Sequence, residues 1–402
     1  MKLIVNSLCR LYYVLTHAYF YITALFNLKP ARGFTLVGPF SSHGSLGKVM
    51  RDIAAALKDA GIPYQTWSTT VRRLAAKDEC KGLMTPRWRF RSRRFSHVIE
   101  MGDSGFPSDT LGLVCFTIAF WEFDTGFVQA HPYVVKKRNL IGMSDFCVET
   151  FRKAVPDDIH VFKLAYPFRS NVIVANDIAS ARKHYNLGLD EFVVFFNFDY
   201  GSSADRKNPE GVVYAFARAF QHDVKARLVF KTMNATNYPQ RVQKLLDLVH
   251  RIGIASQFTT IDNYVSQSDL YTLTAASDVY ISLHRGEGFG LGIAEAMSLG
   301  KAVVVTDFSS TKEFCTIENS IPIPYSTVIV PESIRATFAF HHVETWAEPD
   351  IEKAAQALYR LRCDPALRSD IGSKAKRFIA SHFSIDEFRK SAERLLEVEG
   401  MP

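Results

Sequence analysis

Short apolar runs and amphipathic stretches alternate along the chain from residue 31 onward, and this alternation predicts buried parallel strands joined by helices. The run FTLVG at residues 34–38 predicts a strand, PFSSHGSLG a loop, and KVMRDIAAALKDAG a helix that ends at Gly61. PYQTW then begins a second strand, so the chain opens with a βαβ unit. Further strands of the same sheet are predicted in HVIEM (97–101), GLVCFTIAFWEF (112–123) and NLIGMS (139–144).

A second series of the same kind follows the segment YPFRSNVIVAN, where Pro167 interrupts the pattern. The strands predicted there are EFVVFFNFD, ARLVFKTMN, FTTID, DVYISLH and KAVVVTD, and helices alternate with them. Such regular alternation is typical of a second parallel sheet, so we expect a domain boundary between residues 172 and 173. Three helical stretches follow Pro349, and the last of them, IDEFRKSAERLLEVEG, begins behind Ser384, a favourable helix cap.

The most apolar segment of the chain is residues 1–30, within which residues 11–28 contain no Lys, Arg, Asp or Glu. That length barely suffices to span a bilayer, and no small-residue cleavage site of a signal peptide follows. Polar and tyrosine side chains recur at helical spacing, so the segment predicts a helix with an apolar, aromatic face. Three alternatives are open: the helix lies on a membrane surface, packs on its own domain, or spans the membrane.

The composition fits a globular protein of two or three domains, with 402 residues, of which 47% are hydrophobic and 22% charged. Six cysteines lie far apart without a C-x-x-C pair, so the sequence predicts neither a zinc site nor a disulfide framework and suits the reducing cytosol. The net charge of +7 is uneven, because residues 1–180 hold 23 Lys and Arg against 14 Asp and Glu, and the rest 25 against 27. We therefore expect an acidic partner to meet the first half.

Candidate chemistry concentrates in DVYISLHRGEGFGLGIAEAMSLG, which predicts a strand, a glycine-rich turn and a helix. Glycines at alternate positions from 286 to 292 would let backbone N–H groups approach a ligand, yet their spacing does not match the phosphate-binding pattern G-x-G-x-x-G. A carboxylate at Glu287 would repel phosphate but accepts paired hydrogen bonds from sugar hydroxyls, and Glu295 can do the same for a ribose. The pattern predicts a ligand with hydroxyls at both ends and a diphosphate between them, a nucleotide sugar.

The same residues carry a family resemblance. E-GFGLGIA-E, from Glu287 to Glu295, resembles the E-x7-E signature of the retaining glycosyltransferases of family 4. SSADRKNPEGVVYAFARAF, DLYTLTAASDVYISLHRGEGFG and WAEPD are also similar to that family, in particular to its bacterial polysaccharide branch, and the resemblance covers residues 191–388. It implies an α/β protein of the GT-B fold, with two Rossmann-like domains facing a central cleft. The acceptor domain would span residues 31–172, completed by a last helix that crosses back (386–402), and the donor domain residues 173–385.

The resemblance also implies an activity and roles for individual residues. A hexose-type sugar would move from a nucleoside diphosphate sugar to a glycan or lipid-linked glycan acceptor, in the synthesis of a surface polysaccharide or glycoconjugate. Arg206 and Lys207 match the basic pair that holds the donor diphosphate, with Glu287 on the transferred sugar and Glu295 on the ribose. The other donor-binding residues implied are Gly288, Phe289, Gly290 and Leu291 of the turn, Lys231 at a strand end, and Gly44 and Ser45 of the first domain.

In the mechanism usual for this family, the leaving phosphate oxygen takes the acceptor proton on the same face of the sugar, so no protein nucleophile is expected. Two cations would stabilise the leaving diphosphate as it gains charge, and the D-x-D manganese motif is absent, so we expect neither a metal nor a cofactor. Glu122, or else His43, could meet the acceptor hydroxyl. Gly201 departs from the family pattern, because many relatives have an extra arginine there, and Lys231 could compensate for it.

Functions of two other classes are alternatives. A nucleotide-sugar epimerase can share the fold, and it would form a new sugar from the donor alone. A non-enzymatic binder of anions or nucleic acid is suggested by PRWRFRSRRF, where arginines from Arg87 to Arg94 are interleaved with aromatic residues. A transferase acting on a lipid-linked acceptor would use the same charge at an anionic membrane. We expect this latter role, in a cytoplasmic protein held peripherally at the inner face of the membrane and without a nucleic-acid partner.

Overall fold

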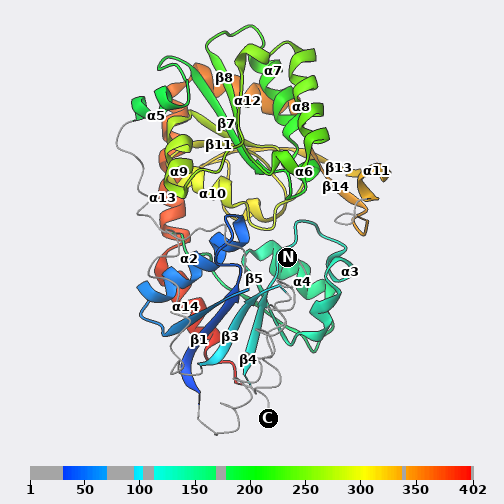
Figure 1. The fold of residues 1–402 in the computed structure, drawn as a ribbon, viewed down its shortest axis with the longest axis vertical. Coiled ribbons are helices and arrows are strands. Elements are labelled where there is room, and N and C mark those ends of the chain that lie inside the picture. The colour runs from blue at the N-terminus through cyan, green and yellow to red at the C-terminus, as the bar shows by residue number, and fades with distance from the viewer. Residues whose placement is uncertain (1–29, 70–94, 103–112, 169–177, 337–340, 400–402) are drawn as a thin grey trace, which may run out of the picture.

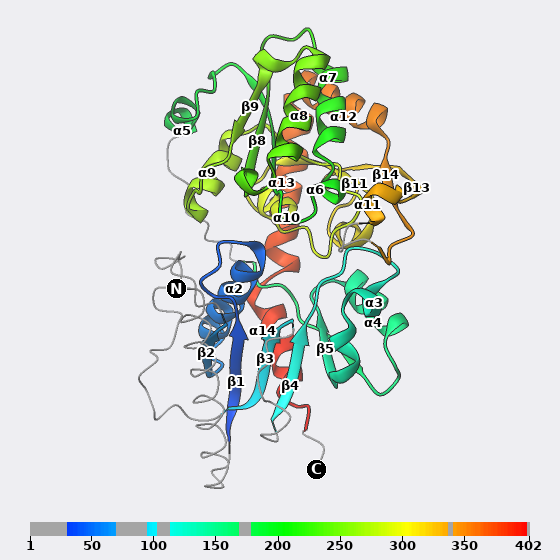
Figure 2. The same cartoon turned by 45° about the vertical axis from the view of Figure 1, so that its right-hand side comes forward.

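The computed structural model describes residues 30–69, 95–102, 113–168, 178–336 and 341–399. Its strands form two six-stranded sheets, one in each half of the chain, and a two-stranded hairpin. Figures 1 and 2 show an elongated molecule in which the two sheets lie one above the other with helices along their faces. We call residues 30–168 the N-terminal half and residues 178–363 the C-terminal half. This arrangement confirms the predicted α/β architecture of two Rossmann-like domains.

The first sheet is parallel and has the strand order β2-β1-β3-β4-β5-β6. Its longest helix, α2 (Ser45–Asp59), forms because apolar side chains recur on one face, and Val49, Ile53 and Leu57 of that face are buried. The strands are β1 (Ala31–Gly38), β2 (Tyr64–Ser68), β3 (Phe95–Met101), β4 (Val114–Ile118), β5 (Asn139–Gly142) and β6 (His160–Lys163). The other helices of this half are α3 (Phe127–Ala130), the 3-10 helix η2 (Pro132–Lys136) and α4 (Asp145–Ala154).

The second sheet is also parallel and has the order β12-β11-β10-β7-β8-β9. Its inner strand β11 (Ala302–Thr306) is buried over its whole length, which explains its unbroken apolar run. The other strands are β7 (Phe192–Asp199), β8 (Ala226–Met233), β9 (Phe258–Ile261), β10 (Val279–Ser282) and β12 (Ile321–Ile323), with the antiparallel hairpin of β13 (Tyr325–Ile329) and β14 (Thr345–Pro349) beside them. The helices are α5 (Ile178–His184), α6 (Ala204–Lys207), α7 (Pro209–Phe220), α8 (Pro239–Ile252), α9 (Gln267–Ala276), α10 (Leu291–Ser298), α11 (Glu332–Arg335) and α12 (Ile351–Cys363), and the 3-10 helices are η3 (Ala235–Asn237), η4 (Ala255–Gln257) and η5 (Ser309–Glu313).

The chain returns to the N-terminal half through its last two helices, α13 (Pro365–His382) and α14 (Ile385–Leu395). Both views show α13 running from the second sheet towards the first, with α14 continuing along the N-terminal half. Ser384 caps α14 by accepting a hydrogen bond from the Glu387 N–H at 3.3 Å, as the sequence predicts. The Ala165 N–H donates to Ser391 Oγ at 3.2 Å, which ties α14 to the end of the first sheet.

One strand is shorter than the sequence predicts. The apolar run 112–123 forms a strand only over β4, and residues 119–123 leave the sheet. Ala119, Trp121 and Phe123 stay buried in an apolar cluster with side chains of α3, α4 and β14. The backbone beside them lies against the glycine-rich turn of the C-terminal half, where a Cβ on Gly286 would lie 2.4 Å from the Glu122 carbonyl oxygen. Burial by a loop contact and burial in a strand leave the same apolar pattern, so the sequence could not separate them.

Three predictions fall on parts of the chain outside the described residues. They are the domain boundary at 172/173, the helix expected within residues 1–30, and the arginine-rich segment up to Arg94. Among the helices that the structure describes, none is long and apolar enough to cross a bilayer.

Candidate functional site

A cleft of about 750 Å³ lies between the two halves and is lined by residues of both. Strands β7, β8 and β10 end at this cleft, which is the edge of a parallel sheet where ligands usually bind. Every residue predicted to bind donor or acceptor lines the cleft: His43, Gly44, Ser45, Glu122, Arg206, Lys207, Lys231, Glu287, Gly288, Phe289, Gly290, Leu291 and Glu295. The structure thus brings the whole predicted set together, and the role of each residue stays a prediction.

The turn between β10 and α10 depends on its glycines. Gly290 caps α10 with a φ of +89°, a left-handed conformation that favours glycine, and a Cβ there would lie 2.9 Å from Thr311 Cγ2. The Gly288 carbonyl accepts hydrogen bonds from Ser144 Oγ at 2.9 Å and Cys147 Sγ at 3.2 Å, both in the N-terminal half. The Gly288 carbonyl therefore serves the contact between the halves, and any ligand contact from this residue would come from its N–H.

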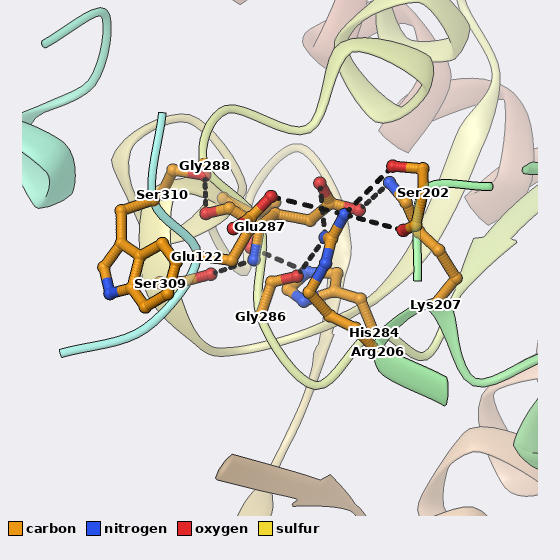
Figure 3. A network of polar contacts seen from close by, with 12 residues as sticks. Glu122, Ser202, Arg206, Lys207, His284, Gly286, Glu287, Gly288, Ser309 and Ser310 are labelled. Atoms are coloured by element: carbon orange, nitrogen blue, oxygen red, sulfur yellow. Dashed lines mark hydrogen bonds and ion pairs between the residues drawn. The ribbon is translucent and has the colours of Figure 1, made fainter. Parts of the chain in front are cut away.

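Glu287 lies against the two cations predicted to hold the diphosphate, as Figure 3 shows. Its carboxylate forms an ion pair with Lys207, and the other oxygen lies 3.2 Å from Arg206 Nη1. The backbone is fixed as well, because the Glu287 N–H donates to Ser309 Oγ at 2.8 Å and Ser310 Oγ donates to the Glu287 carbonyl at 2.6 Å. Burial alone would raise the pKa of Glu287, but the two cations lower it to about 2. Glu287 is therefore ionised throughout the physiological range.

Arg206 and Lys207 differ in burial, with side chains that are 4% and 19% exposed. Arg206 is only 4% exposed; its guanidinium donates to the Gly286 carbonyl at 2.6 Å and lies 3.4 Å from Glu122 Oε1. Burial opposes its charge, but Glu122 and Glu287 raise the pKa of Arg206. Burial lowers the pKa of Lys207; Glu287 opposes this, and the neighbouring Arg206 adds to it. We therefore expect Lys207, the more exposed cation, to be the one that meets a ligand directly.

The two partner shifts in the Glu287–Lys207 pair have different physical sources. Glu287 faces two cations, so attraction outweighs its burial. For Lys207, burial and the like charge of Arg206 together outweigh the attraction of Glu287 and the weaker attraction of Glu122. Behind them His284 is fully buried, and burial lowers its pKa to about 3, so its ring stays neutral at physiological pH. The charge at this end of the cleft is therefore set by Arg206, Lys207, Glu122 and Glu287.

Glu295 lies within α10 and has different surroundings from Glu287. Its Oε1 accepts hydrogen bonds from Gln267 Nε2 at 3.1 Å and Tyr271 Oη at 3.2 Å, and lies 3.5 Å from Lys48 Nζ of the N-terminal half. Lys48 is shared, because its ammonium also forms an ion pair with Asp52. Burial therefore dominates, and the pKa of Glu295 is raised above its ordinary 4.5.

The remaining predicted residues lie around these two carboxylates. Lys231 is buried at the end of β8, where its ammonium donates to the Thr232 carbonyl at 2.6 Å and burial lowers its pKa. Gly44 caps the N-terminus of α2 and Ser45 is its exposed first residue, so the positive end of the helix dipole faces the cleft. The predicted acceptor candidates are near as well: Glu122 pairs with Arg206, and the His43 ring contacts the ring of Tyr264 of the C-terminal half in a tilted arrangement, with the centroids 3.9 Å apart.

Position 201, where an arginine is frequent in relatives, is a turn next to Asp199, whose Oδ1 accepts from the Gly201 N–H at 2.8 Å. No cation occupies that position, and Lys231 lines the same cleft. Within the described ranges, no group of three or more His, Cys, Asp and Glu side chains is arranged to hold a metal ion.

Comparisons with known proteins agree with this geometry. Residues 201–339 match the family model "Glycosyl transferases group 1". The structure matches that of HepE from Anabaena in complex with UDP and glucose, with a TM-score of 0.67 and 14% identity over 92% of this chain and 100% of that one. A glycosyltransferase from Rickettsia africae (TM-score 0.67, 12% identity, 91% and 98% coverage) and sucrose-phosphate synthase from Thermosynechococcus elongatus (0.66, 15%, 91% and 98%) match similarly. The fold is GT-B.

A curated relative is similar over a smaller part of this GT-B chain. A protein of a Sulfolobus islandicus filamentous virus, named as a glycosyltransferase, is 29% identical over 106 residues. The match covers 24% of this chain and 33% of the viral protein, so it spans about a third of that relative's length.

The sequence does not indicate several residues that lie in or next to the GT-B cleft. Lys48, Gln267 and Tyr271 contact Glu295, the Ser309 hydroxyl accepts from the Glu287 N–H, and the buried His284 interacts electrostatically with Glu287. A signal for one of them exists, because Lys48 and Asp52 are four residues apart on the helix that follows the Gly44 loop, a spacing that pairs side chains on one face. The contact of Lys48 with Glu295 across the cleft leaves no signal in a single sequence.

Proposed function

We propose that the protein is a retaining glycosyltransferase that moves a hexose-type sugar from a nucleoside diphosphate sugar to a glycan or lipid-linked glycan acceptor. The observation that carries this proposal is the pair of carboxylates in one cleft, Glu287 against two cations and Glu295 among hydroxyl and amide donors. Hydroxyl-binding groups at both ends and cations at one of them match a nucleotide sugar better than a simple phosphate ligand. The match of residues 201–339 to the group 1 glycosyl transferases supports the same reaction class.

In this proposal the donor lies with its sugar at Glu287, its diphosphate at Lys207 and its ribose at Glu295. The bond between the anomeric carbon and the phosphate oxygen breaks as the acceptor oxygen bonds to the same face of that carbon. The acceptor proton passes to the leaving phosphate oxygen, so the nucleoside diphosphate leaves without a protein nucleophile. Lys207, assisted by the nearby Arg206, would stabilise the charge that develops on the leaving group, which lowers the barrier more than it stabilises bound substrate.

No metal and no cofactor beyond the nucleotide sugar are part of this proposal. The two side-chain cations beside Glu287 can supply the positive charge that a divalent ion supplies in other reactions with a phosphate leaving group. Transfer measured in the presence of EDTA should equal transfer in the presence of added Mn²⁺ or Mg²⁺. A loss of activity in EDTA that Mn²⁺ restores would contradict this part of the proposal.

The most direct test of the reaction class begins with nucleotide binding. A thermal-shift screen with UDP, GDP, ADP and TDP should give stabilisation by one of them, because ligand at a hundred times its dissociation constant adds about 2.7 kcal/mol. The bound UDP in HepE makes UDP the first to try. The matching nucleotide sugars should then release nucleoside diphosphate in the presence of glycan acceptors. Conversion of the donor to a new sugar without acceptor would favour the epimerase, and no binding of any of the four would contradict the proposal.

We also propose that the protein attaches peripherally to the inner face of a cytoplasmic membrane and acts there in surface polysaccharide or glycoconjugate synthesis. The support is sequence alone: the apolar residues 1–28 and the arginines between residues 87 and 94 lie in the basic first half. Flotation with anionic and neutral liposomes tests it, comparing the full chain with a chain that lacks residues 1–28. Equal binding by both chains would contradict attachment through that segment, and sequence-dependent RNA binding would favour the nucleic-acid alternative.

A further inference from the structure

A polar cluster joins the two halves at the Glu295 end of the cleft. It combines Lys48 and Asp52 of α2 and Tyr166 after β6 with Tyr271 of α9 and Glu295 of α10. Both ribbon views place the N-terminal part of α2 directly below α10. The cluster therefore connects the N-terminal half to the residue predicted to bind the ribose.

The contacts of Glu295 are one-sided. Gln267, Tyr271 and Lys48 all contact the same oxygen, Oε1. In the described part of the chain, no residue donates a hydrogen bond to Oε2. A carboxylate has two oxygens with several acceptor sites, so three donors on one oxygen fix its orientation while the second oxygen can accept from a ligand in the cleft.

Lys48 is itself held firmly from the N-terminal side. Its ammonium forms an ion pair with Asp52 and lies 3.4 Å from Tyr166 Oη, and the same tyrosine hydroxyl donates to Asp52. The side chain of Lys48 is only 15% exposed, so it cannot swing freely into solvent. Because Lys48 is held in place, its contact with Glu295 can fix the orientation of that carboxylate towards a ligand.

The charge balance of the cluster indicates which part of a ligand it suits. One ammonium is shared between two carboxylates, Asp52 and Glu295, so the cluster carries an excess negative charge. Such surroundings repel phosphate and favour neutral hydrogen-bond donors such as sugar hydroxyls. This separates the Lys48 cluster from the Arg206 and Lys207 end, where the cations suit the diphosphate.

We propose that Lys48 is a positioning residue for the donor: it reaches from the N-terminal half, holds Glu295 through Oε1, and thereby aims Oε2 at a ribose hydroxyl of the nucleotide. This inference rests on the proposed function, because it takes the ligand to be a nucleotide. It adds that ribose recognition depends on contact between the halves. By reciprocity, a bound nucleotide then stabilises that contact.

The test compares how strongly variants distinguish a ribose from a deoxyribose. The probes are the tightest binder among UDP, GDP and ADP together with its 2′-deoxy and 3′-deoxy forms, titrated by calorimetry. Wild type should bind the ribonucleotide roughly tenfold or more tightly than at least one deoxy form, as expected for a hydrogen bond to a carboxylate. Lys48→Met should lose most of this preference, while Lys58→Met, an exposed lysine on the same helix, should keep it.

Three further variants separate positioning from a general effect on folding. Lys48→Arg should recover part of the preference, and Tyr166→Phe, which keeps the ring and removes the hydroxyl, should lose an intermediate share of it. The Lys48→Met/Glu295→Gln double variant should show no more loss than Glu295→Gln alone, since both changes act on one interaction. Melting curves of each variant confirm that the titrated protein is folded, and Tyr166→Phe carries the test if Lys48→Met does not fold.

The outcomes distinguish this inference from the proposed function. If Lys48→Met weakens the ribonucleotide and its deoxy forms equally, Lys48 acts on the phosphates or on folding, and the inference is overturned while the proposed function stands. The same holds if the wild-type protein binds nucleotide without distinguishing any deoxy form. If no nucleoside diphosphate binds at all, the proposed function falls and the inference falls with it.

Discussion

The two ends of the cleft each hold a buried glutamate, and the pKa values of the two glutamates are shifted in opposite directions. Glu287 and Glu295 lie eight residues apart, both almost fully buried. Around Glu287 two cations lower the pKa to about 2, whereas around Glu295 burial raises the pKa and a single lysine is shared with Asp52. The difference teaches that the partners, more than the burial, decide what a buried carboxylate can do.

This contrast gives the cleft a direction. Glu287 is held permanently ionised beside Lys207, so it can orient hydroxyls next to a charged leaving group. Glu295 has fewer charges near it and more neutral donors, which suits a group that carries no charge, such as a ribose. In the proposed function the first end serves turnover and the second serves affinity, and the following predictions test that division.

The largest effect should come from Glu287→Gln. Without the carboxylate the sugar is no longer oriented, and we expect kcat to fall by about 10²–10³-fold, the scale seen when one oriented group at a reacting centre is removed. Affinity for nucleoside diphosphate should stay the same or tighten, because Lys207 and Arg206 lose their competing anion. Transfer assays and titrations on the same samples check this, with Glu318→Gln, an exposed site of the same half, as control. A loss of diphosphate affinity as large as the loss of kcat would break the comparison.

The second effect belongs to Glu295→Gln and should appear in binding. A hydrogen bond to a charged group contributes about 1.5–3 kcal/mol, so nucleoside diphosphate and nucleotide sugar should both weaken by about tenfold to a hundredfold. At saturating donor, kcat should fall much less than in Glu287→Gln, because the reacting sugar keeps its partner. Titration of both ligands against both variants measures the division directly. An unchanged affinity in Glu295→Gln would contradict the assignment of the ribose to this residue.

A third, smaller effect concerns alkaline pH. Burial lowers the pKa of Lys207 below the ordinary 10.5, so its charge is present below that lowered pKa and is lost as the pH rises through it. The kcat/KM profile, which reports the free protein, should therefore fall on the alkaline side at a pH lower than an ordinary lysine allows. Lys207→Arg should move this fall to higher pH, since a guanidinium keeps its charge, and the exposed Lys244→Arg should not. If the alkaline decrease of kcat/KM stays at the same pH in Lys207→Arg, the titrating group is not Lys207 but another group, such as Lys231.

The smallest effect is on stability in acid, and it has opposite signs for the two glutamates. The folded-state pKa of Glu287 is about 2, below the ordinary 4.5, so its ion pairs stabilise the fold above about pH 4.5 and this contribution is lost as the pH falls towards 2. The destabilisation by Glu287→Gln, measured in denaturant at a series of pH values, should therefore shrink over that window. For Glu295 the folded-state pKa is raised, so ionisation of this carboxyl above about pH 4.5 reduces the stability of the wild-type fold. The stability of Glu295→Gln relative to wild type should therefore improve as the pH rises above about 4.5. Equal pH dependence in both variants would contradict the contrast.

Much of the fold could be predicted from sequence because its signals are local. The apolar run of β11, the helix face of α2 and the cap at Ser384 each follow from neighbouring residues. The predicted end of β4 is wrong because Ala119, Trp121 and Phe123 are buried in a loop that packs on α3, α4 and β14, and β14 lies far along the chain. A single sequence carries no record of that contact.

The site divides in the same way. Glu287, Glu295, Arg206 and Lys207 were recognisable because their spacing matches a family pattern. Their partners were not, since Glu122 meets Arg206, and Lys48 meets Glu295, only after the two halves come together across the cleft. That both basic residues hold the diphosphate stays a prediction, and the contacts of Arg206 with Gly286, Glu122 and Glu287 could not be foreseen from its place in the motif. Residue identity indicates possible chemistry, while tertiary contacts decide which donors and acceptors are still available.

The central claim is that one nucleotide sugar binds with its sugar at Glu287 and its ribose at Glu295. The most direct measurement is a crystal structure of the protein with the nucleotide sugar whose diphosphate binds most tightly. The account predicts hydroxyls of the transferred sugar within about 2.5–3.0 Å of the Glu287 carboxylate and a ribose hydroxyl at the same distance from Glu295 Oε2, with the diphosphate beside Lys207. A donor bound in the reverse direction, or with neither carboxylate on a hydroxyl, would contradict it.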